Sequence, residues 1–352
     1  MTTAASSRFR THAAAPRAQM ETAMPRSLTA FSCTRILAVA LLGAGLVAAP
    51  LALAPPAWAE TAQPAKPKTE PQSFATAAEA ARAMIDAAKS GDKAALLRIF
   101  GSDGEELVNS GDDVADRRGM QELAEAAAKA MSLVEDTPGR VVVVVGAQSW
   151  PMPIPIVKRG ETWVFDVAAG KDEVLTRRIG ENELTTIDVM RAFVEAQQQY
   201  ASVDREGDGI KQYARRIKSR PGKRDGLYWE AKDGEEMSPL GELVAEAESE
   251  GYQPGYRLSR RNQPYYGYYF KMMTRQGAAV PGGSYSYIVN GHMISGFAMV
   301  AYPAQWGNSG IMTFVVNHQG VVFQKNLGAR TAEIAGNMVE YNPDASWERV
   351  KE

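Results

Sequence analysis

The chain has 352 residues, which is enough for two compact domains with cores of their own. Hydrophobic residues make up 45% of the chain and charged residues 23%, as in an ordinary globular protein, and the formal net charge is −2. A charge this close to zero argues against a general attraction to nucleic acid or to anionic lipid.

Residues 1–59 have the pattern of a secretory signal peptide with an upstream extension. An apolar run follows Arg35, and the sequence AWA at 57–59 fits a signal-peptidase site, so we expect export by the general secretory route and cleavage before Glu60. The rival interpretation is an uncleaved membrane anchor, because residues 36–54 are almost long enough to span a bilayer. Three prolines at and beyond the end of this run favour the signal peptide.

Cleavage would leave a protein without cysteine. The one cysteine of the chain, Cys33, lies in the segment that is removed, which excludes disulfides, thiolate nucleophiles and cysteine metal sites. The same step removes five arginines and one glutamate, so the net charge falls from −2 to −6. We therefore expect a periplasmic or secreted protein with no membrane span, no nucleic-acid partner, no metal and no cofactor.

The first domain is expected over residues 74–180, behind a proline-rich linker at 60–73. Helical patterns come first and strand patterns after, which predicts a small α+β domain whose element order is similar to the cone-shaped domains of the nuclear-transport-factor-like superfamily. Thr76 and Glu79 fit a capping box at its first helix. The expected elements are helices from Phe74 to Ser90, from Asp92 to Phe100 and over 116–132, and strands over 140–146 and 162–168.

The second domain, residues 181–345, is predicted to be a helix packed on an antiparallel sheet of four or five strands, with 346–352 as a tail. Thr185 and Asp188 fit a cap for its helix. The apolar residues that share one face of this helix are Leu184, Ile187, Met190 and Val194. The other expected elements are a resumed helix over 210–217, a short helix within 238–252, a strand over 265–275 and hairpins at Asn290-Gly291 and His318-Gln319.

Several segments of the chain carry specific motifs. They read WVFDVAAGKDEVLTRRIGENEL (163–184), DGLYW (225–229), GYYFKMMTRQG (267–277), PGGSYSYIVNG (281–291) and SGFAMVAYPAQWGNSGIMTFVVNHQGVVFQKNLG (295–328). These motifs resemble a bacterial secreted family catalogued as domain of unknown function 2950, over most of residues 75–345. The resemblance implies an exported envelope protein, and it implies no activity and no catalytic residues.

The order of a long helix followed by strands reading GYYF and GNSG is also similar to the globular heads of type IV pilins and pseudopilins. A pilin begins with a wholly apolar helix, whereas the helix expected here starts at Asn182 behind a soluble domain and carries Arg191, Glu195 and three consecutive glutamines. This likeness therefore implies a pilin-head-like sheet and no assembly through a membrane-drawn helix bundle.

Two histidines remain after cleavage, and both lie at predicted turns. His292 follows Asn290-Gly291, and His318 is in the next turn. We interpret both as polar residues at strand ends, with a catalytic role or a metal-ligand role as the alternatives. No GxSxG or HExxH motif accompanies them.

Residues 210–224 contain seven basic residues in an otherwise acidic mature chain, and Arg257, Arg260 and Arg261 follow. Basic groups beside aromatic rings suit an anionic glycan, lipopolysaccharide or an acidic partner surface. The predicted partner-binding residues are Lys211, Arg215, Arg216, Lys218, Arg220, Tyr228, Trp229, Tyr265 and Tyr266. The alternative is a solvated helix end beside aromatic side chains that fill the sheet core.

Asp225 and Glu230 flank the aromatic stretch GLYW, which would suit the face of a sugar ring. An envelope hydrolase acting on glycan or peptide cross-links would use this pair in acid–base roles. Otherwise they are a turn aspartate and a solvated glutamate. We favour a binding or assembly module at the cell envelope, with the hydrolase as the alternative.

Overall fold

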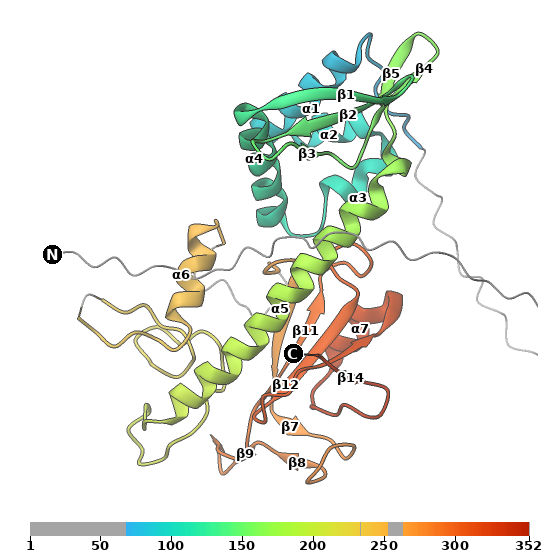
Figure 1. Ribbon diagram of the computed structural model, residues 1–352. Helices are drawn as coiled ribbons and strands as arrows, with labels where there is room; N and C mark the ends of the chain where they lie inside the picture. The colour runs from blue at the N-terminus through green and yellow to red at the C-terminus, as the bar shows by residue number, and fades with distance from the viewer. Residues whose placement is uncertain (1–67, 233, 253–262, 352) are drawn as a thin grey trace, which may run out of the picture. The chain divides into compact units, whose positions relative to one another are not determined.

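The computed structural model describes residues 68–232, 234–252 and 263–351 (Figure 1). The expected signal peptide, most of the linker and the three arginines at 257, 260 and 261 lie outside these residues. Among the residues described, no helix has both the length and the apolar character needed to cross a bilayer. The chain combines α-helices with antiparallel sheets, which confirms the predicted α+β class.

The N-terminal half begins with helices whose ends are set by local side chains. These helices are α1 (Ala77–Ser90), α2 (Lys93–Phe100), α3 (Glu105–Val108) and α4 (Asp113–Lys129). The predicted capping box is confirmed, since Thr76 Oγ1 accepts from Glu79 N while Glu79 Oε2 accepts from Ala75 N. Gly91 ends α1 with φ of 66°, and Asp92 caps α2.

The first sheet contains three strands that the sequence pattern missed, at 131–137, 150–151 and 156–159. Its members are β1 (Met131–Thr137), β2 (Arg140–Val145), β3 (Trp150–Pro151), β4 (Ile156–Arg159) and β5 (Thr162–Phe165), in the order β1-β2-β4-β5 with β3 also paired to β2. The helix expected to reach Ser132 ends at Lys129 instead. The reason is non-local, because β1 pairs with the valine-rich strand β2, whose alternate valines are buried beneath the helices.

Helix α5 (Lys171–Ala201) starts earlier than Asn182, where we expected it to begin. Thr185 and Asp188 therefore lie inside the helix, and their assignment as a cap is wrong. The predicted buried face is confirmed at Met190 and Val194, which are buried, and at Ile187, which packs against the core, but it is wrong at Leu184, which is 67% exposed. The buried residues of α5 are Asn182, Thr186, Val189, Met190, Phe193, Val194, Ala196, Gln197 and Tyr200.

The second sheet confirms the prediction of a helix on an antiparallel sheet. Its strands are β6 (Tyr268–Met273), β11 (Ala298–Pro303), β12 (Met312–Asn317), β13 (Phe323–Asn326) and β14 (Glu348–Arg349), in the order β14-β13-β12-β11-β6. Figure 1 shows α5 lying along β11 and β12, with α7 (Thr331–Asn337), which the sequence did not predict, beside the same sheet. Every residue of β11 is buried as a result.

Short strand pairs border this sheet. They are β7 (Arg275–Gln276) with β8 (Tyr285–Ser286), and β9 (Ile288–Val289) with β10 (His292–Met293). The predicted hairpin at Asn290-Gly291 is confirmed, and both residues have positive φ, as a type I′ turn requires. The second hairpin, β12 with β13 around His318, is confirmed as well.

Between α5 and α6 (Gly241–Ser249) the chain is mostly irregular. The helix expected to resume over 210–217 is absent, so that prediction is wrong. Gln197 of α5 takes up the backbone bonds that a helix would have used, since its side chain accepts from Ala214 N at 2.8 Å and donates to Ala214 O at 2.9 Å. This pairing holds residues 210–217 extended against α5.

Candidate functional site

The exposed basic residues between Ile210 and Arg224 form what we call the cationic segment. Its members are Lys211, Arg215, Arg216, Lys218, Arg220, Lys223 and Arg224, all of them exposed. Gln212, Ala214, Ile217 and Ser219, which lie between them, are buried. The extended chain therefore turns its apolar and neutral residues inward and its cations outward, and a helix would have distributed them differently.

Carboxylates neutralise only part of the cationic segment. Asp225 binds Arg220 Nε at 2.5 Å and lies 3.7 Å from Arg216 Nε. Arg224 lies within 4 Å of Glu235 and Glu236, at 3.8 and 3.4 Å. The remaining members, Lys211, Arg215, Lys218 and Lys223, form no ion pair with any residue in the described part of the chain.

The aromatic residues that were predicted to bind a partner instead contact other residues of this chain. Tyr228, Trp229 and Tyr265 are buried in the core of the C-terminal half, and Tyr266 is half-buried. The Trp229 ring lies 5.4 Å from the Arg224 guanidinium, and its Nε1 donates to a backbone carbonyl. Tyr266 donates to Glu250, far along the chain from the cationic segment. The surface open to a partner therefore consists of basic side chains, and of these rings Trp229 packs against one of them, Arg224.

The structure gives Asp225 a role in shaping the turn that carries the cations. Its carboxylate accepts from both the backbone N and the side chain of Arg220, at 2.8 and 2.5 Å. Burial alone would raise the pKa of Asp225, but the hydrogen bonds from Arg220 and the charges of Arg216 and Arg220 outweigh it and lower the pKa. Such a carboxylate stays ionised and is poorly suited to donate a proton. Glu230 is exposed.

Replacing Asp225 by asparagine is expected to lower the free energy of unfolding by about 1–2 kcal/mol at pH 7. The folded-state pKa of Asp225 lies below its unfolded value, so this stabilisation is present above about pH 4 and is lost as the pH falls through the folded pKa. Urea unfolding of both proteins at pH 7 and at pH 3 measures the difference. A difference that is the same at both pH values would contradict the assigned pairing.

The two histidines have different surroundings. His292 is partly exposed, and its Nδ1 lies 3.5 Å from Asp208 Oδ2. His318 packs edge-on against Tyr287, and burial lowers its pKa, so it is neutral at pH 7. Over the ranges that the structure describes, no group of three or more histidine, cysteine, aspartate or glutamate residues is arranged to hold a metal ion.

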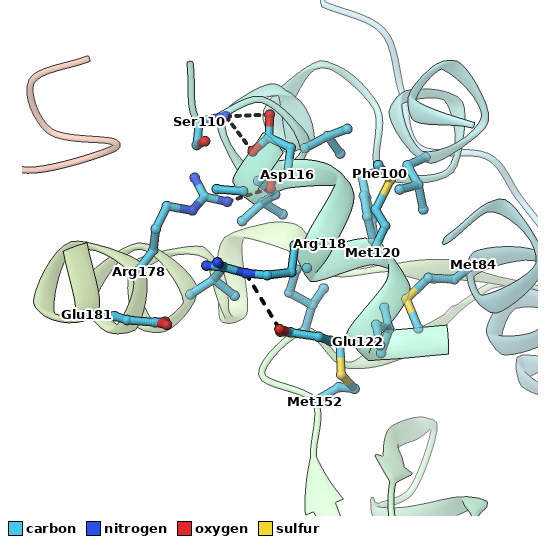
Figure 2. Close-up of a pocket in the computed structure, with 18 of the residues that line it drawn as sticks. Met84, Phe100, Ser110, Asp116, Arg118, Met120, Glu122, Met152, Arg178 and Glu181 are labelled. Carbon is cyan, nitrogen blue, oxygen red and sulfur yellow. Dashed lines mark hydrogen bonds and ion pairs between the residues drawn. The ribbon is translucent and has the colours of Figure 1, made fainter. Parts of the chain in front are cut away.

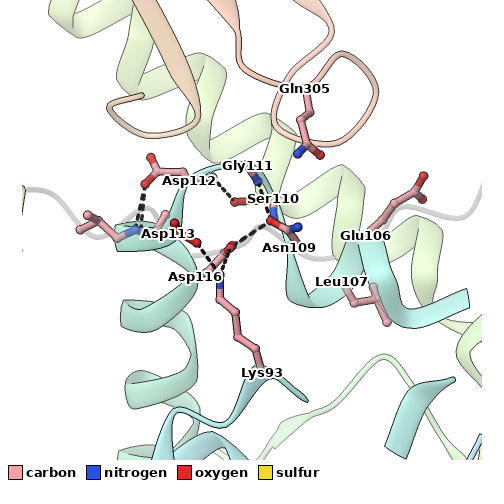
Figure 3. Close-up of polar contacts among 12 residues, drawn as sticks. Lys93, Glu106, Leu107, Asn109, Ser110, Gly111, Asp112, Asp113, Asp116 and Gln305 are labelled. Atoms are coloured by element: carbon pink, nitrogen blue, oxygen red, sulfur yellow. Dashed lines mark hydrogen bonds and ion pairs between the residues drawn. The ribbon is translucent and has the colours of Figure 1, made fainter. Parts of the chain in front are cut away.

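Two residues outside the predicted partner-binding and catalytic sets join the two halves of the chain. Arg178 of α5 donates to the carbonyls of Glu106 and Leu107, at 2.7 and 2.6 Å, and to Asn308 Oδ1 at 2.5 Å. Asp112 lies in the connection between α3 and α4 (Figure 3), and it accepts from Tyr252 and Gly267. The position of Asp112 before a helix indicates a cap, but its distant partners have no local sequence signal.

The fold and these charges define an α+β protein in which a helix covers a five-stranded antiparallel sheet and a non-helical cationic segment lies beside that helix. The chain belongs to the family described as Protein of unknown function (DUF2950), which it matches over residues 71–350. The family assignment made from the motifs is therefore confirmed. No curated protein and no solved structure matches the chain.

Proposed function

We propose that this protein is an exported binding module of the cell envelope that holds an anionic glycan through the cationic segment. The observation that carries the proposal is the exposure of Lys211, Arg215 and Lys218 without a described carboxylate partner. In a mature chain of net charge −6, such a cluster concentrates positive potential in one short segment.

Several weak ion pairs between the cationic segment and one polymer can add up to stable binding. One exposed ion pair contributes only about 0–1 kcal/mol. A polymer that carries many carboxylates or phosphates can contact several cations at once, so the contributions combine without any deep pocket. The partly neutralised members Arg216 and Arg220 hold the turn in place, which leaves the lysines and Arg215 for the partner. Binding of this kind weakens steeply as salt is added.

The test is a charge-reversed variant, Lys211→Glu, Arg215→Glu and Lys218→Glu together. We expect its retention on immobilised lipopolysaccharide at low salt to fall at least about tenfold, since each lost contact is replaced by repulsion. The readout is the bound fraction as a function of salt concentration, measured on purified chains.

The matched control reverses three exposed lysines elsewhere, Lys89→Glu, Lys129→Glu and Lys158→Glu, and changes the net charge by the same amount. This control should keep most of the retention if the cationic segment is the site. Equal loss in the two variants would show that only net charge matters and would contradict the proposal.

A further inference from the structure

A separate cavity of about 400 Å³ lies in the N-terminal half of the described chain (Figure 2). Helices α1, α2, α3, α4 and α5 and the segment before β4 all contribute to its wall. Its apolar lining includes Met84, Leu96, Phe100, Met120, Leu123 and Met152. Cavities of roughly 300–1,000 Å³ with such linings are typical of small-molecule sites. No member of the cationic segment lines it.

A glycine in the wall leaves this space open. Gly119 lies within α4 and lines the cavity, and a Cβ built on it would meet no heavy atom within 4 Å. Glycine inside a helix costs about 1 kcal/mol relative to alanine, and neither a turn nor a close contact at Gly119 requires it. A side chain at this position would project into the cavity without a clash. The glycine therefore leaves a volume in the cavity that a larger side chain at position 119 would fill.

A partly buried cation, Arg178, lines the side of the cavity opposite Met84 and Phe100. Arg178 donates three hydrogen bonds, all to uncharged carbonyl and amide oxygens. No carboxylate in the described ranges forms an ion pair with it. Burial lowers its pKa. The charges of Asp116 and Glu106 offset this burial only in part and form no ion pair with Arg178, so an anionic group of a ligand that paired with it directly would stabilise it.

The carboxylates around the cavity are already compensated or lie in solvent. Asp116 is paired with Lys93 at 2.9 Å. Glu122 is exposed and lies 3.6 Å from Arg118, which also binds Glu250. Glu181 is exposed. Of the cations that line the cavity, Arg178 is thus the one without an ion pair to a carboxylate in the described ranges, and the rim carboxylates are screened by water.

We propose that the cavity binds a small amphipathic carboxylate, with its apolar body among the methionines and Phe100 and its carboxylate at Arg178. At roughly 30 Å³ for a group the size of a water molecule, the cavity holds about a dozen such groups. An apolar chain of about ten carbons with one carboxylate matches this volume. The three methionines suit a flexible chain, because their unbranched side chains adapt to its shape.

The experiment titrates the purified full chain with decanoate, decan-1-ol and decylammonium by isothermal calorimetry, each probe below its micelle concentration. These probes share a chain and differ only in the head group. We expect decanoate to bind at least about tenfold more tightly than the other two, because only its head group pairs with Arg178. Arg178→Gln should remove this preference and leave the affinity for decan-1-ol unchanged.

Gly119→Leu tests the cavity itself without relying on the junction that Arg178 maintains. It should fill the space and weaken decanoate binding at least about tenfold, while leucine in place of glycine favours the helix. The matched control is Gly180→Leu, which changes a glycine of α5 that does not line the cavity and has equal free space around its Cβ. This control should bind decanoate as the wild type does.

Three results would overturn the proposal. They are decanoate binding that survives Gly119→Leu, a preference for decan-1-ol or decylammonium over decanoate, and no binding of any of the three probes. None of these results depends on the cationic segment, so the proposed glycan binding and the cavity proposal can fail separately.

Discussion

Replacing Phe193 by alanine is expected to lower the free energy of unfolding by about 3–5 kcal/mol. The ring is 1% exposed and packs edge-on against Phe297, with 5.4 Å between ring centroids. Truncation would leave a void in the core between α5 and the second sheet. Urea unfolding followed by circular dichroism measures the change, and the slope with urea should stay unchanged if only packing is lost.

The matched control is Leu184→Ala on the same helix. Leu184 is 67% exposed, so its removal should change the free energy of unfolding by no more than about 0.5 kcal/mol. The two variants test whether Leu184 lies outside the buried face of α5, as the structure shows, or within it, as the apolar spacing predicted. A loss at Leu184 as large as the loss at Phe193 would mean that the helix faces the sheet in a different rotational setting.

The buried face of α5 shows how much a hydrophobic pattern can establish. Helical spacing placed Met190 and Val194 on the buried side correctly, but it also placed the exposed Leu184 there and did not predict that the polar residues Asn182 and Thr186 are buried. Asn182 is accommodated there by donating to Ser309 O at 2.8 Å. A polar residue that finds its partner more than a hundred positions away cannot be recognised as buried from local sequence.

Predictions that depend on neighbouring residues succeeded for a physical reason. The capping box at Thr76 and the hairpin at Asn290-Gly291 both arise from bonds and backbone angles within a few residues. Strand β1 was missed because its pairing with β2 decides its conformation, and an alanine-rich helix directly precedes it. The helix expected over 210–217 failed for the same reason, since the side chain of Gln197 fixes that backbone from outside.

At the candidate sites too, features set by neighbouring residues could be predicted from the sequence, and features set by distant residues could not. Clustered charge in the sequence predicted an exposed cationic segment, and its basic residues are exposed. Aromatic residues beside it were expected to share the surface, but Tyr228 and Trp229 are buried, as large rings next to a sheet commonly are. The cavity had no sequence signal, because its wall comes from five helices and a loop that only the fold brings together.

Replacing Asp112 by alanine is expected to lower the free energy of unfolding by about 4 kcal/mol. Its side chain is fully buried, and it accepts four hydrogen bonds, from the backbone N of Val114, Ala115 and Gly267 and from the hydroxyl of Tyr252. Alanine would leave these donors without a partner in the interior. The exposed neighbour Asp113 pairs only with Lys93, so Asp113→Ala should cost no more than about 1 kcal/mol.

The pH dependence of Asp112 separates the two effects that act on its carboxyl group. Burial raises its pKa, and the hydrogen bonds from Gly267, Ala115, Tyr252 and Val114 oppose this with a smaller effect, so the folded pKa lies above the unfolded value. The stability that the carboxyl contributes is therefore complete below about pH 4 and is lost as the pH rises through the folded pKa. Relative to Asp112→Asn, which does not ionise, the wild type should lose stability between pH 4 and pH 7. A wild-type advantage that grows over this range would show instead that the four donors outweigh burial and hold the carboxylate ionised.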